Sequence, residues 1–591
     1  METRKHYYTD ERNAQIVIAL LKAHGIKDIV ISPGATNDCF VLSVQDDPDF
    51  NLYSAVDERH AGYLACGISE EKKRPVVLNC TGATASRNYM SAMTEAYYRK
   101  LPILALTCSQ HYSHLGNLHP QMTDRFNPPS DVAKLSVQCP IPHTKEEEWD
   151  CNLKVNRALL ELSHRGGGPV HINLETSYSR RYSLGVVPSA RTIRRVVATD
   201  KSWPTITDGA KIVIWMGSHT PLSTDEASAI ENFLKAHNAV VLGDMTSNYK
   251  GMQFVAPSLL GCQKQFWANR MHAELRPDLI VHIGEVCGDY SLMSLLRCGA
   301  PVWRVSPDGE LRDPLRALTY VFEMPENEFF KYYTKSGVGN KSYASSWGDA
   351  LCRLQARKPE IPFSELYVSE VLARSIPEQV ELHLGILNPL RCANLALPNC
   401  KRVFCNVGGF GIDGTVSELI GAASVCPNTL YLGVVGDLSF FYDLNSLGSR
   451  HLGKNIRLLI LNNGEGGEFL VPGNIVECDA CGERVHDYIS ARGHYGKKSR
   501  TLIKNFSESL GMRYFVATNK DELAIELPKF LGREGESAAV LECFTDSRDD
   551  RNALAAYSSI EACSVSVRLK TAIGSMLPAD VRNVAKHIIK K

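Results

Sequence analysis

Two short motifs in the last third of the chain combine residue types that bind a divalent cation and a diphosphate. Gly436-Asp437 supplies a carboxylate after an apolar run, and Asn463 follows 26 residues later in the pair Asn462-Asn463. Carboxylate, amide and backbone carbonyl oxygens are the hard ligands that suit Mg²⁺, which takes its remaining ligands from water and phosphate. The spacing therefore predicts a metal-centred diphosphate site.

The elements around these motifs are expected to form one β-α-β unit. The pattern predicts strands over 430–435 and 456–461, with a helix beginning at Ser439 between them. Parallel strands joined by a right-handed crossover end at the same edge of a sheet, so Asp437 and Asn463 should be neighbours. Free N–H groups at the helix start would face a phosphate. The alternative is a capping Asp and an Asn-Asn-Gly turn without a ligand.

The same alternation of apolar runs and helices recurs along the chain and is typical of α/β proteins with parallel sheets. The first helix is expected to be capped by Thr9 or Asp10 and closed by Gly25. Polar linkers divide the chain near residues 190 and 360. We therefore predict three doubly wound parallel-sheet domains and a tail, at 1–190, 200–355, 360–560 and 561–591.

Composition excludes several classes of protein. The chain has 591 residues, with 65 Lys and Arg against 65 Asp and Glu, and this balance disfavours a nucleic-acid partner. No apolar stretch approaches the ~20 residues of a membrane span, and no signal-peptide pattern opens the chain. The 18 Cys at irregular spacing are interpreted as reduced thiols in a cytoplasmic protein.

A glycine motif offers a different interpretation of the same region. Gly409–Gly414 fits G-x-G-x-x-G after a predicted strand, and Asp437 lies 23 residues beyond its last glycine. This pattern also fits a dinucleotide fingerprint, with the acid on a ribose hydroxyl. An NAD-dependent oxidoreductase is therefore an alternative, although glycine is frequent in this chain.

The Gly-Asp-x-Ser and Asn-Asn pair resembles the thiamine-diphosphate motif of the 2-oxo acid decarboxylase and carboligase superfamily. Segment 436–447, GDLSFFYDLNSL, and segment 411–423, GIDGTVSELIGAA, are similar to the menaquinone-pathway branch, which makes 2-succinyl-5-enolpyruvyl-6-hydroxy-3-cyclohexene-1-carboxylate. So are Ser32-Pro33-Gly34 and segment 57–62, DERHAG. The resemblance implies pyrimidine-binding, central and diphosphate-binding domains, with thiamine diphosphate and Mg²⁺ as cofactors.

The resemblance assigns roles residue by residue. Glu58 matches the carboxylate that hydrogen bonds to the aminopyrimidine ring and promotes removal of a thiazolium proton. Asp437, Asn463 and the Glu465 carbonyl match the Mg²⁺ ligands. Further positions match cofactor contacts: Ser32, Pro33, Gly34, Thr81, Gly82, Gly411, Ile412, Gly436, Leu438, Ser439 and Phe469. In this superfamily the two halves of the site come from different subunits, which implies a homodimer or a homotetramer.

The chain departs from the menaquinone branch where that branch binds carboxylates. Thr36, Gln110 and Val407 stand where arginines are expected, whereas Arg391 matches a fourth arginine. Loss of a bidentate guanidinium is not a conservative change. With Phe469, which matches an aromatic of the reaction pocket, Thr36, Gln110 and Arg391 are the expected substrate contacts. The menaquinone substrates are accordingly not expected.

Two further segments are candidates for the altered substrate site. His111, His114, His119 and Gln121 follow a first-domain strand, where relatives keep groups that shuttle protons, and a neutral His serves as acid or base near pH 7. Surface histidines on a mobile loop are the alternative. The segment 464–500 has a basic end that would either close over the substrate or remain solvated. Its C-x-x-C, Cys478 and Cys481, lacks the second ligand pair of a zinc site.

These observations predict a thiamine-diphosphate-dependent carboligase that decarboxylates a 2-oxo acid and transfers the acyl unit to an unidentified acceptor. Simple decarboxylation with release of an aldehyde is the alternative within the class. Two alternatives belong to other classes of protein: an NAD-dependent oxidoreductase, and a binding protein that descends from this superfamily but has lost catalysis. Binding of FAD or a nucleotide by the central domain is left open.

Overall fold

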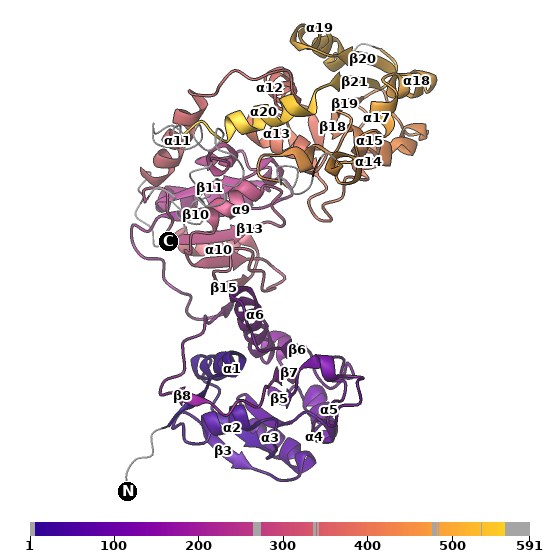
Figure 1. Ribbon diagram of the computed structural model, residues 1–591. Coiled ribbons are helices and arrows are strands. Elements are labelled where there is room, and N and C mark those ends of the chain that lie inside the picture. Colours follow the sequence, from indigo (N-terminus) through magenta and orange to yellow (C-terminus); the bar gives the residue numbers. More distant parts are fainter. Residues whose placement is uncertain are drawn as a thin grey trace, which may run out of the picture. The chain divides into compact units, whose positions relative to one another are not determined.

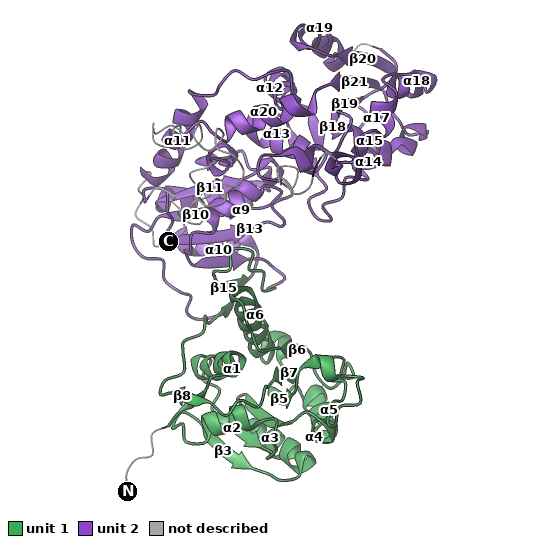
Figure 2. Ribbon diagram, in the orientation of Figure 1, with its two compact units in different colours: residues 1–197, 309–323 green, residues 198–308, 324–591 purple. Residues whose placement is uncertain are grey.

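The computed structural model describes residues 6–263, 273–334, 339, 342–474, 482, 484–532 and 535–561 (Figure 1). The chain divides into two compact units (Figure 2). The first comprises residues 1–197 and 309–323, and the second comprises 198–308 and 324–591. Among the described residues, no helix has the length and apolarity required to cross a bilayer.

The first unit is built on a six-stranded parallel sheet of order β3-β2-β4-β5-β7-β6. Its strands are β2 (Asp28–Ile31), β3 (Asn51–Ser54), β4 (Val76–Thr81), β5 (Ile103–Ser109), β6 (Ser136–Cys139) and β7 (Val170–Glu175). Helices α1 (Arg12–Ala23), α2 (Asp38–Val44) and α6 (Lys145–Glu161) contribute to one core cluster, and α3 (Glu58–Lys72) and α5 (Met90–Arg99) to another. β4 is buried apart from its last residue and β5 is buried throughout, as expected for parallel strands covered on both faces.

The start of α1 differs from the expectation. Its N-cap is Glu11, which makes no side-chain capping bond, so the expected cap at Thr9 or Asp10 is wrong. Thr9 belongs instead to the short strand β1 (Tyr8–Thr9), which pairs with β8 (Tyr182–Leu184). The Glu11 carboxylate accepts hydrogen bonds from the Ser177 amide at 2.8 Å and the Thr176 hydroxyl at 3.1 Å. The helix closes near Gly25, whose φ of 69° lies in the left-handed region.

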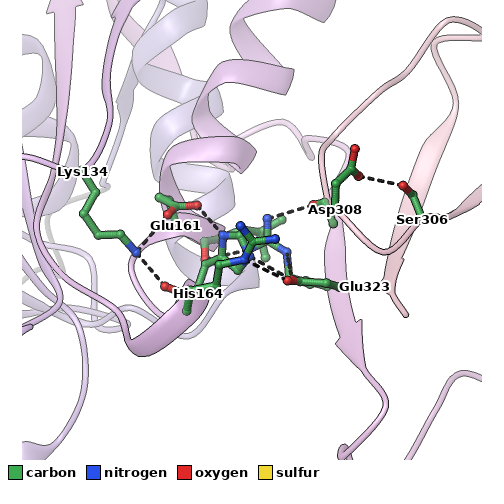
Figure 3. Close-up of polar contacts among 10 residues, drawn as sticks. Lys134, Glu161, His164, Ser306, Asp308 and Glu323 are labelled. Atoms are coloured by element: carbon green, nitrogen blue, oxygen red, sulfur yellow. Dashed lines mark hydrogen bonds and ion pairs between the residues drawn. The ribbon is translucent and has the colours of Figure 1, made fainter. Parts of the chain in front are cut away.

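A buried histidine ties the separate segment 309–323 to the first unit. β15 (Leu318–Glu323) pairs in parallel with β9 (Arg194–Val197) and ends at Glu323. His164 lies between two carboxylates, with Nδ1 2.8 Å from Glu161 and Nε2 2.9 Å from Glu323 (Figure 3). Lys134 pairs with Glu161 at 2.9 Å. This ion-pair network fixes the end of β15 on residues that follow α6.

The second unit begins with a parallel sheet whose strands run in the order β12-β11-β10-β13-β14. These strands are β10 (Ile212–Met216), β11 (Ala239–Gly243), β12 (Phe254–Val255), β13 (Leu279–Ile283) and β14 (Val302–Val305). Its helices include α7 (Thr224–Ala236), α8 (Ser258–Gly261), α9 (Tyr290–Leu296), α10 (Glu326–Thr334) and α11 (Ser342–Gln355). β10, β11, β13 and β14 are buried along their whole length.

The other sheet of the second unit is again parallel and six-stranded, with order β17-β16-β18-β19-β21-β20. Its strands are β16 (Glu381–Leu384), β17 (Arg402–Cys405), β18 (Tyr431–Gly436), β19 (Ile456–Asn462), β20 (Arg513–Ala517) and β21 (Ala539–Phe544). The surrounding helices are α12 (Glu365–Ser375), α13 (Asn388–Ala396), α14 (Thr415–Val425), α15 (Asp437–Tyr442), α18 (Leu502–Ser509), α19 (Lys520–Leu531) and α20 (Ser547–Tyr557). The predicted α/β fold with three parallel sheets is confirmed.

Candidate cofactor and substrate site

Asp437 and Asn463 follow adjacent strands at one edge of the third sheet. β18 and β19 are parallel and in register from Tyr431–Ile456 to Gly436–Leu461. The residues after these pairs therefore meet at the carboxyl edge, as the predicted β-α-β unit requires. The backbone N–H groups of Leu438 and Gly464 act to lower the pKa of the Asp437 carboxyl.

The helix between the two strands begins earlier than expected. α15 starts at Asp437, with Gly436 as its N-cap, so the expected start at Ser439 is two residues too late. The Ser439 hydroxyl donates to the carbonyl of Ile412, in the loop between β17 and α14. This contact joins two segments that the resemblance assigns to the cofactor.

The Asp437 carboxylate has the properties of a cation ligand. The residue is 3% exposed, and its Oδ2 has no hydrogen-bond partner among the described residues. Burial raises the pKa of this carboxyl to about 7, although backbone N–H groups oppose the shift. A buried oxygen with unused acceptor capacity is costly without a partner, and a divalent cation would satisfy it. The residue therefore fits the expected Mg²⁺.

The Asn463 side chain is held in the orientation that a metal ligand needs. Its amide nitrogen lies 3.0 Å from Asp550 Oδ2 and 3.3 Å from Glu365 Oε1. The NH₂ group donates to both acids, so Oδ1 points elsewhere. Oδ1 accepts a bond from the Glu465 amide at 3.1 Å. Asn463 thus presents an oxygen toward the loop that carries the expected third ligand.

Glu365 and Asp550 form a buried carboxylate pair behind Asn463 that the sequence did not indicate. The Glu365 amide donates to Asp550 at 2.8 Å, and Asn388 donates to the Glu365 carboxylate at 2.9 Å. Burial, followed by the charge of Asp550, raises the pKa of Glu365, and burial raises the pKa of Asp550 to about 6. The two acids are 98 and 87 residues from Asn463 in the chain, and no local motif connects them.

The Glu465 side chain contacts the following segment. Its carboxylate accepts from the Ser490 hydroxyl at 2.8 Å and lies 3.0 Å from His486 Nδ1. Burial raises the pKa of Glu465, but hydrogen bonds from Ser547, His486 and Ser490 outweigh burial and lower it. The Glu465 side chain therefore anchors α16 (Val485–Tyr488). The atom of Glu465 that is expected to bind the metal is its backbone carbonyl oxygen.

The basic end of segment 464–500 lies beside the same loop. Tyr495, the first residue of α17 (Tyr495–Lys498), stacks on Phe441 with ring centroids 4.5 Å apart. A Cβ at Gly464 would lie 2.7 Å from the Lys497 side chain. Phe469, in the loop after Asn463, remains 37% exposed. Cys478, Cys481 and residues 562–591 of the tail lie outside the described residues.

The first sheet brings its own predicted cofactor contacts together. A Cβ at Gly34 would lie 1.9 Å from the Thr81 side chain, so the loops after β2 and β4 pack without space between them. Ser32, at the end of β2, is buried, and its hydroxyl has no partner among the described residues. A Cβ at Gly82 would lie 2.7 Å from Arg125 Cζ. β2 and β4 are adjacent in the sheet, so this is its topological switch point.

Glu58 opens α3 and is only partly buried. Asp57 caps the helix by accepting a hydrogen bond from the His60 amide at 3.0 Å. The Glu58 carboxylate accepts one hydrogen bond, from Asn88 at 3.1 Å. Among the described residues, Glu58 is therefore held by one side chain, and its remaining acceptor sites are open.

The expected substrate residues of the first unit form two separate groups. Thr36 is buried, and its hydroxyl donates to the Cys108 carbonyl at 2.8 Å, so it braces β5. Gln110 donates to the Tyr178 hydroxyl at 3.0 Å and bonds His114 Nδ1 at 2.9 Å. His114 stacks on His119 with centroids 4.0 Å apart.

Two other predicted residues of that loop stand apart. His111 accepts a hydrogen bond from the Ser113 amide and thereby caps a short 3₁₀ turn. Gln121 is exposed and has a φ of 66°. The loop thus contains one hydrogen-bonded cluster and two residues outside it.

Arg391 is placed on α13 in the second unit. It pairs with Glu468 at 2.7 Å and lines a cavity of about 300 Å³ together with Asn394, Ser258 and Asp289. The glycine motif at 409–414 leads into α14, whose N-cap Gly414 has a φ of 83°. Among the described residues no cluster of three or more His, Cys, Asp or Glu side chains is positioned for a metal. A metal at this edge therefore requires amide and carbonyl oxygens.

Comparisons with known proteins identify the family. Residues 12–127 match the model of the thiamine pyrophosphate enzyme, N-terminal TPP binding domain. The chain is 31% identical over 572 residues to the 2-succinyl-5-enolpyruvyl-6-hydroxy-3-cyclohexene-1-carboxylate synthase of Phocaeicola vulgatus, covering 93% of this chain and 98% of that protein.

Further relatives carry the same name. The synthase of Bacteroides thetaiotaomicron is 30% identical over 576 residues, covering 93% of this chain and 99% of that protein. The synthase of Flavobacterium johnsoniae is 28% identical over 568 residues, covering 92% and 98%. The chain therefore belongs to the thiamine-diphosphate-dependent enzyme family that includes these synthases.

Proposed function

We propose that the protein is a Mg²⁺- and thiamine-diphosphate-dependent carboligase that decarboxylates a small 2-oxo acid and transfers the acyl unit to an acceptor. The observation that carries the proposal is the buried Asp437 oxygen, which has no hydrogen-bond partner among the described residues, at the same sheet edge as the oriented amide of Asn463. Family membership supplies the cofactor class. The NAD-dependent alternative has no comparable support.

Each half of the site has its own task in this proposal. Asp437, Asn463 and the Glu465 carbonyl hold Mg²⁺, and Glu58 holds a proton at the aminopyrimidine nitrogen. When bound, thiamine diphosphate supplies the electron sink for the carbanion left by loss of carbon dioxide. The hydrogen bond from Asn88 orients Glu58 without saturating its oxygens.

The substrates differ from those named for the relatives in this proposal. Thr36 and Gln110 are committed to the Cys108 carbonyl and to Tyr178 and His114, and neither offers a guanidinium to a carboxylate. The His114–His119 stack, with His111 and Gln121, lies on the loop that we propose exchanges protons with the acceptor. The donor is a small 2-oxo acid, and the acceptor is unidentified.

The protein acts as a homodimer, or as a tetramer of such dimers, in this proposal. Glu58 of one copy serves the cofactor held by Asp437 and Asn463 of the second copy. The support is the resemblance, in which the pyrimidine and diphosphate halves of a site belong to different subunits.

Carbon dioxide release tests the proposal directly. The purified protein is incubated with thiamine diphosphate, Mg²⁺ and a panel of small 2-oxo acids, with EDTA as the control. Carbon dioxide that depends on both cofactors, with an acyl adduct when an acceptor aldehyde or alkene is added, supports the carboligase. A free aldehyde as the sole product under all conditions favours simple decarboxylation. Cofactor binding without turnover on any acid favours a non-catalytic descendant.

A further inference from the structure

A second cavity lies in the first unit, at the carboxyl ends of β5, β6 and β7. It has a volume of about 240 Å³, and Arg125 contributes the guanidinium at its wall. Arg125 is only 7% exposed. None of the sequence motifs pointed to this residue, which lies four positions beyond Gln121 in the histidine loop.

Within the described part of the chain, the hydrogen bonds of Arg125 go to neutral acceptors. Its Nε donates to Asn173 Oδ1 at 3.2 Å and its Nη1 donates to Thr123 Oγ1 at 3.0 Å. No carboxylate among the described residues forms an ion pair with it. The carboxylate of Asp124 is exposed and accepts a hydrogen bond from the Phe126 amide at 2.9 Å.

A buried guanidinium without a counter-charge is energetically unfavourable. Burial lowers the pKa of Arg125, yet a guanidinium stays protonated in proteins, so the charge must be stabilised in another way. Taking one ion out of water is unfavourable unless an opposite charge compensates it. An anion in the adjacent cavity would supply that compensation.

A second donor lines the same cavity. The amide nitrogen of Gln138 is buried and has no hydrogen-bond partner among the described residues. A carboxylate has two oxygens, and a guanidinium beside an amide donor can satisfy both. The cavity lining thus contains two donors without an anionic partner among the described residues, which match the two oxygens of one carboxylate.

The other charged groups of the lining are Lys154 and Glu175. Lys154 is paired with Asp150 at 2.6 Å, so its charge is already compensated. Burial raises the pKa of Glu175, and its negative form would oppose an anion in the cavity. Apolar surface comes from Tyr112, Leu115, Met122 and Phe126. The lining therefore combines one uncompensated cation with an apolar wall.

We propose that this cavity binds a small organic acid, with its carboxylate on Arg125 and Gln138 and its apolar body against the aromatic and aliphatic wall. The inference does not depend on the proposed function, because its test measures binding. Gln110 also lines the cavity, so the acid is either a substrate of the carboligase or a separate effector with the same chemistry.

Isothermal titration of the full-length protein with benzoate and with benzamide tests the proposal. The two probes have nearly the same shape and differ in charge. Benzoate is expected to bind about tenfold more tightly or better, since one charge-assisted hydrogen bond accounts for such a ratio. Equal affinities, or no benzoate binding up to about 10 mM, would overturn the proposal.

Three variants sharpen the test. Arg125→Met should weaken benzoate binding about tenfold or more, and Glu175→Gln should strengthen it several-fold by removing a like charge. Lys154→Met is the matched control, with a change of less than about threefold, because Asp150 already compensates that lysine. If Arg125→Met does not fold, the benzoate affinity of Glu175→Gln tests the proposal. Unchanged affinity in either test variant contradicts the proposal.

Turnover reactions separate the two sources of the acid. Competition of benzoate with the donor or the acceptor would mark a substrate subsite, and a change in kcat without competition would mark an effector site. Either outcome supports an acid-binding cavity. No effect of benzoate on thiamine-diphosphate affinity is expected, which distinguishes this cavity from the cofactor site.

Discussion

The first and third sheets have the same strand order, yet their carboxyl edges carry different chemistry. Counting strands within each sheet, both run 2-1-3-4-6-5. The third sheet has a buried Asp437 after β18 and, around Asn463, the buried acids Glu365 and Asp550. The first sheet places a partly exposed Glu58 at a helix start and a buried Arg125 nearby. One scaffold thus supplies two kinds of site through its loops.

The difference follows from how each carboxylate is solvated. Asp437 is buried, has an oxygen without a hydrogen-bond partner among the described residues, and has a raised pKa, so a bound cation would stabilise its ionised form. Glu58 is partly exposed and keeps one hydrogen bond at the N-terminus of a fifteen-residue helix. A group that exchanges protons needs access, whereas a metal ligand needs exclusion of water. The two edges meet these opposite requirements.

The largest expected effect comes from substitution of the partly exposed Glu58. Glu58→Gln should lower kcat by about 100-fold or more while thiamine-diphosphate binding is kept, because only proton transfer is removed. Glu71→Gln, at an exposed acid on the same helix, is the control. The measurements are carbon dioxide release and cofactor titration. Full activity in Glu58→Gln would remove this residue from the chemistry.

Substitution of the buried Asp437 should change the affinity for the cofactor. Asp437→Ala is expected to weaken Mg²⁺-dependent thiamine-diphosphate affinity on the order of 100-fold, beyond the effect typical of a residue behind the ligands. Asp521→Ala, at an exposed acid of α19, should leave the affinity unchanged. Titration calorimetry in the presence of Mg²⁺ and of EDTA gives the thiamine-diphosphate affinity of each variant with and without the metal. A loss of affinity equal in both variants would contradict a metal role for Asp437.

Glu365→Gln tests whether Glu365 orients the expected metal ligand Asn463. It replaces one of the two Glu365 oxygens, which accept from Asn463 and from Asn388, with an NH₂ donor and should weaken cofactor affinity about tenfold. The same change relieves repulsion with Asp550, so the cofactor-free protein should melt at a higher temperature. Glu360→Gln is the exposed control. Weaker binding with a lower melting temperature would indicate general disruption instead.

The smallest expected effect is on stability and concerns one buried histidine in the first sheet, His171, and one in the third sheet, His383. Burial lowers the pKa of His171 and of His383 to about 4, from 6.5. The unfolded chain therefore binds more protons between these values, and stability falls as the pH falls from about 6.5 to about 4, by about 3 kcal/mol for each group. We expect the melting temperature to drop across this window.

The two histidines also differ in a testable way. His171 bonds Thr107 at 2.8 Å and Ser136 at 2.9 Å, whereas neither ring nitrogen of His383 has a partner among the described residues. His383→Phe should therefore reduce the acid sensitivity of melting with little loss at pH 7. His171→Phe should lose stability at pH 7 through its two broken hydrogen bonds. Identical melting curves for the two variants would contradict this distinction.

The fold could be predicted because its signals are local. Buried parallel strands are short continuous apolar runs, and each ends in small or polar residues, so the sheets followed from the printed sequence. Helix starts were less reliable. Thr9 was expected to cap α1 but pairs in a strand, and α15 begins at Asp437, where Gly436 rather than Ser439 marks the start.

The candidate site could be predicted only in part. Asp437 and Asn463 belong to one β-α-β unit, so their meeting at one sheet edge follows from short-range topology. Glu365 and Asp550 come from helices far along the chain, and Arg125 acquires meaning only through its burial beside a cavity. Such groups have no spacing rule, because tertiary packing alone brings them to the site.

Mixing two inactive variants tests the central claim most directly. At a cofactor concentration that does not saturate Asp437→Ala, the Glu58→Gln and Asp437→Ala proteins each lose nearly all activity in this account, but a hybrid dimer would hold one site with both residues intact. Random exchange of subunits makes half of the dimers hybrids, so about a quarter of the wild-type carbon dioxide release should return. If the mixture stays as inactive as its components after proven subunit exchange, Glu58 and Asp437 do not serve one cofactor across two copies.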